Sequence, residues 1–330
     1  MELRRVVIIA YPGLQPLDAV GPFEVFAGAT RAAAMLGRPG GYRVTLASRA
    51  GRPVAGESGL SLCTVPLPDP AERIDTLVLP GGEQARAARG DDVLLSWIEA
   101  AAPRSRRVAT VCTGAFLAAE AGLLDGRRVT THWASADKLA AEFPALRVDP
   151  DPIYIRDGKF WTSAGVTAGI DLALALVQDD LGVEVAQTVA RWMVMFLHRP
   201  GGQTQFASPV WVPRAERSTV RAVQCMVEAA PGGDHRVPAM AAAAAMSVRH
   251  FARVFVTEVG ETPSRFVERV RIEAARHELE TTDDTLDLIA VRCGLGTAET
   301  LRRAFRRRLN VAPDAYRRRF CVAVEERTSA

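Results

Sequence analysis

The sequence predicts an α/β fold, a doubly wound parallel sheet, followed by an all-α part with two helix-turn-helix motifs. Over the first two hundred residues, short β-branched runs alternate with Ala- and Leu-rich stretches. This alternation is typical of a parallel sheet covered by helices on both faces. Near the C-terminus, one pattern of residues occurs twice at an offset of fifty residues. The length of 330 residues agrees with two domains.

The elements of the α/β part follow from local composition. The predicted strands are β-branched apolar runs at residues 6–10, 42–48, 76–79 and 107–111. The predicted helices are longer and rich in good helix formers, at residues 23–36, 92–102, 114–121, 135–143 and 169–181. Residues 199–213 are rich in Pro, Gly and polar side chains, which predicts a linker. We therefore expect domains at residues 1–200 and 218–330, with a linker at 201–217.

The repeated pattern has the spacing of a capped helix. Ser or Thr caps the first turn, apolar residues four apart face a core, and Gly or Asn followed by Pro ends the helix. A short apolar helix precedes each copy, at residues 240–245 and 286–293, so that each copy makes a helix-turn-helix. The matched residues are Ser247, Phe251, Arg253, Phe255, Gly260, Pro263 and Phe266, and then Thr297, Leu301, Arg303, Phe305, Asn310, Pro313 and Tyr316.

Basic residues are concentrated in the C-terminal part. Residues 214–330 carry 20 arginines against 16 acidic residues, whereas residues 1–213 carry 21 basic and 22 acidic residues. Five arginines lie on the second helix of the second motif, and a basic face there indicates DNA binding. They are Arg302, Arg303, Arg306, Arg307 and Arg308.

Residues 218–320 resemble the AraC/XylS family of transcriptional regulators, most strongly over residues 287–320 (DLIAVRCGLGTAETLRRAFRRRLNVAPDAYRRRF). The first motif departs from the family pattern at Ala245, where the turn usually carries Gly. The resemblance implies that two helices enter successive segments of the major groove of double-stranded DNA. The side chains expected to read bases are Arg249, Arg253, Glu299 and Arg303, because Arg suits guanine and Glu can accept from cytosine N4. Arg302, Arg306 and Arg307 are expected to contact phosphates, and His250 is expected to face away from Arg253.

A cysteine follows the predicted strand at residues 107–111, where a helix begins almost at once. This is a nucleophile-elbow arrangement with the sulfur of Cys112 in the nucleophile's place. The helix N-terminus favours thiolate, so we expect a lowered pKa and the fastest alkylation of the five cysteines. Backbone N–H groups of Gly81 and Gly82 are candidates to stabilise an oxyanion, and His132 is expected near the same edge of the sheet.

Residues 4–200 resemble the DJ-1/PfpI superfamily, which has a glutamine-amidotransferase-like, flavodoxin-like fold, and within it the isocyanide-hydratase-like branch. The motifs that carry this resemblance are residues 17–26 (LDAVGPFEVF), 80–82 (PGG), 111–114 (VCTG), 122–133 (GLLDGRRVTTHW) and 162–171 (TSAGVTAGID). The branch implies that Asp18 lies beside Cys112 and handles its proton, and that Thr113 belongs to the pocket. A protonated Asp18 would donate a hydrogen bond to sulfur. With residues 200–206, the whole chain resembles the GlxA-like and amidase-type AraC regulators.

Composition limits the remaining classes. The hydrophobic fraction is 48% and the net charge is +3, which is ordinary for a soluble globular protein. The five cysteines lack paired spacing, so we expect no disulfide framework, no metal and no cofactor. The apolar run at residues 6–10 is too short for a signal peptide, and no segment approaches the ~20 apolar residues of a membrane span. The expected location is the cytoplasm.

These observations predict a homodimeric transcriptional regulator that senses a small molecule or an electrophile at Cys112 and is not an enzyme. Two alternatives remain open. The chain is an active cysteine-dependent hydratase or amidohydrolase fused to a DNA reader, or its first domain is only a dimerisation scaffold.

Overall fold

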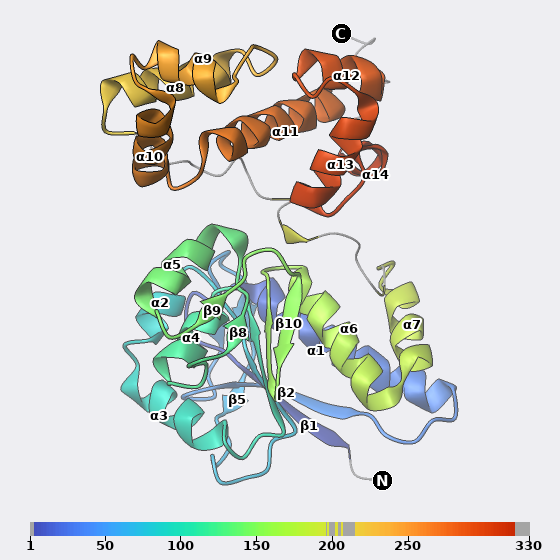
Figure 1. The fold of residues 1–330 in the computed structure, drawn as a ribbon. Coiled ribbons are helices and arrows are strands. Elements are labelled where there is room, and N and C mark those ends of the chain that lie inside the picture. The colour runs from blue at the N-terminus through green and yellow to red at the C-terminus, as the bar shows by residue number, and fades with distance from the viewer. Residues whose placement is uncertain (1–2, 196, 198–201, 204–205, 207–214, 321–330) are drawn as a thin grey trace. The chain divides into compact units, whose positions relative to one another are not determined.

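The computed structural model describes residues 3–195, 197, 202–203, 206 and 215–320. The chain divides into two compact units, residues 1–204 and 205–330 (Figure 1). Most of the linker expected at residues 201–217 lies outside the described residues. Among the residues that are described, no single helix is long and apolar enough to cross a membrane. A helix pair bent by 84°, Val237–Ala243 with Val248–Val259, passes that test by length and composition alone.

The first unit is built around a mostly parallel sheet. In the part of the chain that the structure describes, the order is β10-β11-β7-β6-β1-β2-β5. Only β10 runs antiparallel to its neighbour, β11. The parallel sheet and its four predicted strands are confirmed. The strands are β1 (Arg4–Ile9), β2 (Tyr42–Ser48), β5 (Val65–Pro66), β6 (Thr76–Leu79), β7 (Arg107–Val111), β10 (Tyr154–Asp157) and β11 (Phe160–Ser163).

Helices cover both faces of this sheet (Figure 1). One face carries α1 (Pro16–Met35), α6 (Ala168–Leu181) and α7 (Val183–Trp192). The other carries α2 (Ala85–Ala88), α3 (Asp92–Ala101), α4 (Gly114–Glu120) and α5 (Ala136–Glu142). Short ladders pair β3 (Val54–Ala55) with β4 (Ser61–Leu62) and β8 (Arg128–Val129) with β9 (Arg147–Val148), and a 3-10 turn, η1, spans Trp133–Ser135.

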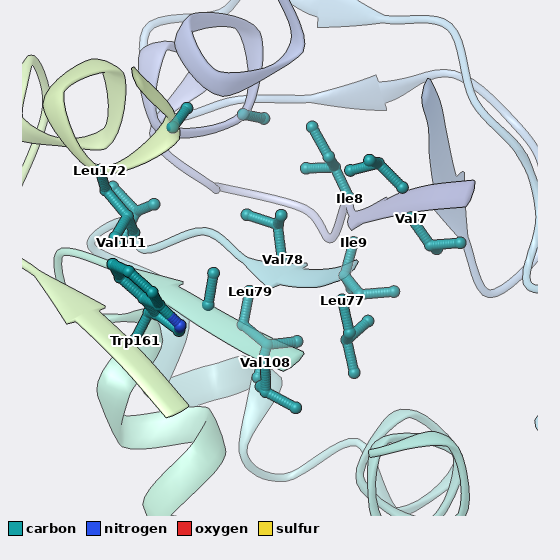
Figure 2. Close-up of a cluster of buried hydrophobic side chains, with 14 of the residues drawn as sticks. Val7, Ile8, Ile9, Leu77, Val78, Leu79, Val108, Val111, Trp161 and Leu172 are labelled. Carbon is teal, nitrogen blue, oxygen red and sulfur yellow. The ribbon is translucent and has the colours of Figure 1, made fainter. Parts of the chain in front are cut away.

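The central strands are buried on both faces. Every residue of β6 and β7 is buried, as are the last four of β1. Figure 2 shows this core, in which Ile8, Leu77 and Val108 lie among other branched aliphatic side chains. Burial on both faces explains why these strands are continuous apolar runs rather than alternating ones. It also leaves the carboxyl ends of the strands as the place where polar loops gather.

Helix α1 begins seven residues before the predicted start at residue 23. Gly21 and Pro22 are poor helix formers, yet the helix runs through them. A Cβ at Gly21 would lie 2.9 Å from Cγ1 of Ile170, so the glycine allows α1 to pack closely on α6. The Gln15 side chain caps the helix by accepting from the N–H of Leu17, at 3.1 Å. The earlier start places Asp18 in the first helical turn, beside the carboxyl edge of the sheet.

The second unit contains two separate hydrophobic cores. Figure 1 shows α11 running between the two groups of helices within this unit. Phe266 and Val270 in the first half of α11 belong to one core, and Ile272 and Leu279 in its second half belong to the other. The helices are α8 (Ser218–Ala229), α9 (Val237–Ala243), α10 (Val248–Val259), α11 (Pro263–Thr281), α12 (Leu286–Arg292), α13 (Ala298–Leu309) and α14 (Pro313–Phe320).

The predicted repeat of capped helices is present in full. Ser247 accepts from the N–H of His250 at 3.3 Å, and Thr297 accepts from that of Thr300 at 3.2 Å. Gly260 and Asn310 end α10 and α13 in the left-handed conformation, with φ of 82° and 51°. Each copy therefore forms a helix-turn-helix, α9–α10 and α12–α13, on its own core.

The turns of the two motifs differ in backbone strain. Ala245 has a φ of 54°, whereas Gly294 holds the left-handed position of the second turn at 73°. A left-handed residue with a Cβ costs about 1–2 kcal/mol, which glycine avoids. We therefore expect Ala245→Gly to raise the free energy of unfolding of the second unit by about 1 kcal/mol. The measurement is denaturant unfolding of the full chain followed by circular dichroism.

The matched control for Ala245→Gly is Ala242→Gly, at an exposed position inside α9. Here the helical backbone suits alanine, so glycine should lower stability by about 0.5–1 kcal/mol. Changes of the same sign in both variants would show that the strain of the Ala245 turn does not govern stability.

Candidate ligand site and nucleic-acid interface

The corner after β7 has the geometry of a strained elbow. Cys112 has a φ of 55°, which is uncommon for a residue with a Cβ. Its N–H donates to the carbonyls of Ser163 (3.1 Å) and Ala164 (2.8 Å), which fixes the corner against β11. Val166, in the loop after β11, also has a φ of 55°. Backbone strain at two facing loops persists where the surroundings enforce it, and such sites are often functional.

Both strained residues line one cavity of about 410 Å³ at the carboxyl edge of the sheet. The walls come from the loops after β1, β6, β7 and β11, from the β3–β4 hairpin, and from the segment that leads into α5. Of the predicted pocket residues, four line the cavity and two, Asp18 and Gly81, do not. The lining residues are Gln15, Glu57, Gly82, Glu83, Ala85, Cys112, Thr113, Phe116, His132, Ser135, Lys138 and Val166.

Asp18 lies behind the cavity wall, fully buried. One carboxylate oxygen accepts from the N–H of Gly81 at 3.0 Å, and the other accepts from the N–H of Val166 at 2.9 Å. Asp18 therefore joins the loop after β6 to the loop after β11. Burial raises the pKa of Asp18 to about 7, against the opposing effect of the two backbone hydrogen bonds.

The expectation of a low-pKa thiol at Cys112 is wrong. Burial raises the pKa of Cys112 to about 12, and the negative charge of Asp18 acts in the same direction. The N–H and hydroxyl of Thr113 favour the thiolate but do not offset desolvation. The corner is also closed on one side, because a Cβ at Gly165 would lie 2.6 Å from the sulfur. The thiol is therefore neutral at physiological pH.

The predicted oxyanion site is also wrong, because both of its donors are occupied. The N–H of Gly81 donates to Asp18, and the N–H of Gly82 donates to the hydroxyl of Thr113 at 2.9 Å. The described contacts likewise include no hydrogen bond from Asp18 to the sulfur of Cys112. Both Asp18 oxygens instead face backbone donors, so Asp18→Asn would set an amide N–H against one of them. Asparagine is consequently not a mild replacement for Asp18.

His132 lies at the cavity, as the sequence predicted for this edge of the sheet. Burial lowers its pKa, and Nδ1 accepts from the N–H of Ala134 at 3.3 Å. This hydrogen bond leaves the proton of the neutral ring on Nε2. A Cβ at Gly165 would lie 2.9 Å from Cδ2 of His132, so the ring and the Cys112 thiol flank the same glycine.

Glu57 is a cavity residue that the sequence did not reveal. It lies in the β3–β4 hairpin, and its carboxylate accepts from Nε2 of Gln15 at 2.6 Å and from the N–H of Glu83 at 2.8 Å. Glu83 and Lys138 add opposite charges to the lining. No motif surrounds Glu57, and only the folded hairpin brings it to the cavity. In the described part of the chain, no three His, Cys, Asp or Glu side chains gather as metal ligands.

The raised pKa of Cys112 has a direct consequence for alkylation. At neutral pH the exposed thiols of Cys63 and Cys225 should react with iodoacetamide before Cys112. The Cys112 rate should rise about tenfold per pH unit without a plateau below about pH 10, because the thiolate fraction grows until the pKa is reached. Mass-spectrometric mapping of adducts against pH measures both effects. If the alkylation rate of Cys112 instead reached a plateau near neutral pH, the pKa of its thiol would be low.

Most of the predicted DNA-reading side chains are exposed. On α10 these are Arg249 and Arg253, and on α13 they are Glu299, Arg303 and Arg306. Arg302 is half-buried. Among the described residues, no ion pair or hydrogen bond engages the side chains of Arg249, Arg302, Arg303 and Arg306, which leaves them available to a ligand.

Three neighbouring side chains refine this surface. Arg307 forms an ion pair with Glu268 of α11, so a phosphate contact would have to replace it. Arg308 points inward and donates to the carbonyl of Arg265 at 3.1 Å. The expectation that His250 faces away from Arg253 is wrong, since Nη2 of Arg253 lies 3.4 Å from Nδ1 of His250. One helical turn brings the two side chains together.

An elbow cysteine at the edge of a parallel sheet, joined to tandem helix-turn-helix motifs, defines a class of two-part regulators. Residues 4–179 match the DJ-1/PfpI family, and residues 240–319 match the family described as helix-turn-helix domain. The HTH-type transcriptional regulator Rv1931c of Mycobacterium tuberculosis is 40% identical over 279 aligned positions, and the alignment covers 76% of this chain and 97% of that protein.

Two further similarities are to an enzyme and to a solved structure. Isonitrile hydratase of Pseudomonas putida is 32% identical over 64% of this chain and 86% of its own length. The crystal structure of a ThiJ/PfpI family protein from Pseudomonas syringae aligns with a TM-score of 0.52 and 24% identity, over 74% of this chain and 90% of that one. The chain belongs to the family of transcriptional regulators that join a DJ-1/PfpI domain to an AraC-type helix-turn-helix domain.

Proposed function

We propose that this chain is a sequence-specific DNA-binding regulator of transcription that acts as a cytoplasmic homodimer. The second unit, from about residue 218, reads double-stranded DNA. The first, to about residue 200, holds a small-molecule effector in the Cys112 cavity and forms the dimer. The observation that supports DNA reading best is the pair of capped second helices, α10 and α13, with exposed arginines that have no partner among the described residues. Protection of promoter DNA in a footprint is the direct test.

The roles of individual arginines can be separated by substitution. Arg303→Ala should cost about 1–3 kcal/mol on the preferred sequence and relax the base preference at one position, because a bidentate base contact is lost. Arg306→Ala should weaken all sequences alike and flatten the salt dependence of binding, because a phosphate contact is lost. Binding isotherms on matched and mismatched duplexes at several salt concentrations measure both. Equal and sequence-independent losses would remove the distinction between base and phosphate readers.

The character of the cavity favours reversible binding of an effector over reaction with one. A neutral thiol is a poor nucleophile, and the backbone donors at Gly81 and Gly82 are already engaged. Glu57 and Glu83 disfavour an anionic group beside them, whereas Lys138 can pair with one. An effector with a neutral or cationic group facing Glu57 fits this charge pattern. Chemical-shift or melting-temperature changes on addition of such compounds test it.

The similarity to isonitrile hydratase raises an alternative to effector binding, namely that the first unit is a catalyst. We propose that the chain does not turn over substrate, since the thiol is neutral and the corner offers no free oxyanion donors at Gly81 and Gly82. Isonitrile hydration by the purified chain that disappears in Cys112→Ser would overturn this proposal. A first unit that serves only as a scaffold would show no stabilisation by any compound that reaches the cavity.

A further inference from the structure

The end of the first unit is fastened to the wall of the Cys112 cavity by one buried side chain. Gln203 is only 2% exposed, although it lies in a stretch of sequence rich in Pro, Gly and polar residues. Its Oε1 accepts from the N–H of Trp133 at 2.8 Å, and its backbone N–H donates to the carbonyl of Asp151 at 2.6 Å. Its Nε2 lies within hydrogen-bond distance of Thr130 Oγ1 (3.0 Å) and of the carbonyls of Thr131 (2.9 Å) and Pro152 (3.1 Å).

The loop that holds Gln203 is the loop that carries His132. Thr131 precedes His132, and its hydroxyl donates to the carbonyl of Cys112 at 2.8 Å. The N–H of Trp133, on the other side of His132, is held by Gln203 itself. The cavity residues Cys112 and His132 are therefore joined to Gln203 through one short hydrogen-bonded segment. An occupant that shifts the backbone at His132 moves the carbonyl of Thr131 and the N–H of Trp133, which hold Gln203.

A substituent on the Cys112 sulfur must extend into the cavity that His132 also lines. Gly165 closes one side, since even a Cβ there would lie 2.6 Å from the sulfur and 2.9 Å from Cδ2 of His132. Beyond Gln203 the chain continues to the DNA-reading unit, in which Gln224 supplies another buried amide. There, Oε1 of Gln224 accepts from the N–H of Ala215 at 2.9 Å. A buried glutamine thus fastens each end of the connecting segment to its own unit.

We propose that Gln203 is a positioning residue that couples occupancy of the Cys112 cavity to DNA binding by holding the start of the connecting segment on the His132 loop. The inference rests on the proposed sensing function. Leaving a buried amide without hydrogen-bond partners costs free energy. The Gln203 side chain therefore has two states, one hydrogen-bonded to the loop and one exposed to water. An occupant of the cavity that shifts the loop changes the balance between them, and this is the differential interaction that allosteric coupling requires.

The test uses a covalent occupant, because the natural effector is not needed. Cys63, Cys225 and Cys321 are replaced by Ser in the full chain, and the buried Cys293 is replaced by Ala, because its pKa is raised only to about 11 and it would also react. N-ethylmaleimide is then attached to Cys112 at alkaline pH and the adduct is verified by mass spectrometry. DNA affinity is then compared with and without the adduct. We expect a change of at least about fivefold in Kd in the parent chain, and a change of less than about twofold in Gln203→Ala.

Two variants separate coupling from damage. Gln203→Glu keeps an acceptor for Trp133 but places carboxylate oxygens against the carbonyls of Thr131 and Pro152, so it should lose the coupling as Gln203→Ala does. Gln224→Ala removes the matched amide in the second unit, so it should alter DNA affinity equally with and without the adduct and keep the fivefold response. Circular dichroism and melting of each variant verify that both units are folded.

The outcomes are distinct. An adduct response in Gln203→Ala equal to that of the parent chain overturns the role of Gln203 and leaves the sensing function intact. No response to the adduct in the parent chain contradicts the sensing function, and the coupling falls with it. Loss of the response in Gln224→Ala as well as in Gln203→Ala would show that any loosening of the connection abolishes it, which also overturns a specific role for Gln203.

Discussion

Replacing Asp180 by alanine is expected to lower the free energy of unfolding of the first unit by about 3–5 kcal/mol, because the change leaves a buried guanidinium without its partner. The side chains of Asp180 and Arg107 are only 2% and 3% exposed, and they form an ion pair. Asp180 also accepts from Arg106 at 2.7 Å and from the hydroxyl of Tyr42 at 2.8 Å. Among the described groups, Nη1 of Arg107 already lacks a hydrogen-bond partner.

Asp179 provides the matched control for Asp180. It pairs with Arg156 at 3.3 Å, and its only contact with Arg107 among the described groups is a long one, 3.9 Å to Nη1. Its side chain is 36% exposed, so Asp179→Ala should cost less than about 1 kcal/mol. Denaturant unfolding followed by tryptophan fluorescence reports mainly on the first unit, because four of the five tryptophans lie within residues 1–204. DNA binding by the second unit should persist in conditions where the first has unfolded. Comparable losses from the two aspartates would mean that burial of the Arg107 pair does not set its contribution.

The Asp180 cluster and the cavity lie at opposite edges of one sheet. Tyr42, Thr76 and Arg107 are the first residues of β2, β6 and β7, whereas Cys112 follows the last residue of β7. The amino edge is locked by a buried ion pair, and the carboxyl edge holds the strained loops and the cavity. This division agrees with the general rule that open α/β sheets bind ligands at the carboxyl ends of their strands.

The sequence predicted those features that depend on local pattern. The alternation of strand and helix patterns predicted a parallel sheet. The short connection between a strand and the next helix located the elbow at Cys112. The fifty-residue offset gave both helix-turn-helix motifs with their caps. The sequence did not predict elements whose local residue pattern differs from that of a typical strand or helix. β10 and β11 were overlooked because Arg156, Asp157 and Lys159 interrupt their apolar residues, and the start of α1 was misplaced because Gly21 and Pro22 are poor helix formers.

The chemistry of the site could not be predicted, because it depends on burial and on partners distant in sequence. A helix N-terminus lowers the pKa of a thiol locally, but desolvation of Cys112 and the charge of Asp18 oppose it and are larger. The donors of Gly81 and Gly82 were expected to be free. Their partners, Asp18 and Thr113, lie 63 and 31 residues away in the chain. Glu57 reaches the cavity only through its hairpin.

Replacing Phe305 by alanine is expected to destabilise the second helix-turn-helix motif by about 3–5 kcal/mol while leaving the first one folded. Phe305 is fully buried and its ring packs edge-on against Tyr316, with centroids 5.3 Å apart. Its core is separate from the one around Phe255, the matched position of the first motif. Loss of one motif should therefore remove half of the contact with DNA rather than all of it.

Footprinting distinguishes the two positions. Phe305→Ala should lose protection over the part of the site that α13 reads, and Phe255→Ala, which empties a fully buried position between Phe251 and Phe266, should lose the other part. Leucine at either position keeps most of the buried apolar volume, so it should retain the full footprint at a smaller cost in stability. Damage could spread through α11, which contributes to both cores, or through the loop at Gly232, which lies against Arg292 and Gly294. Simultaneous loss of both halves in Phe305→Ala would show that α11 unites the motifs into a single cooperative fold, and the two cores would then not be independent.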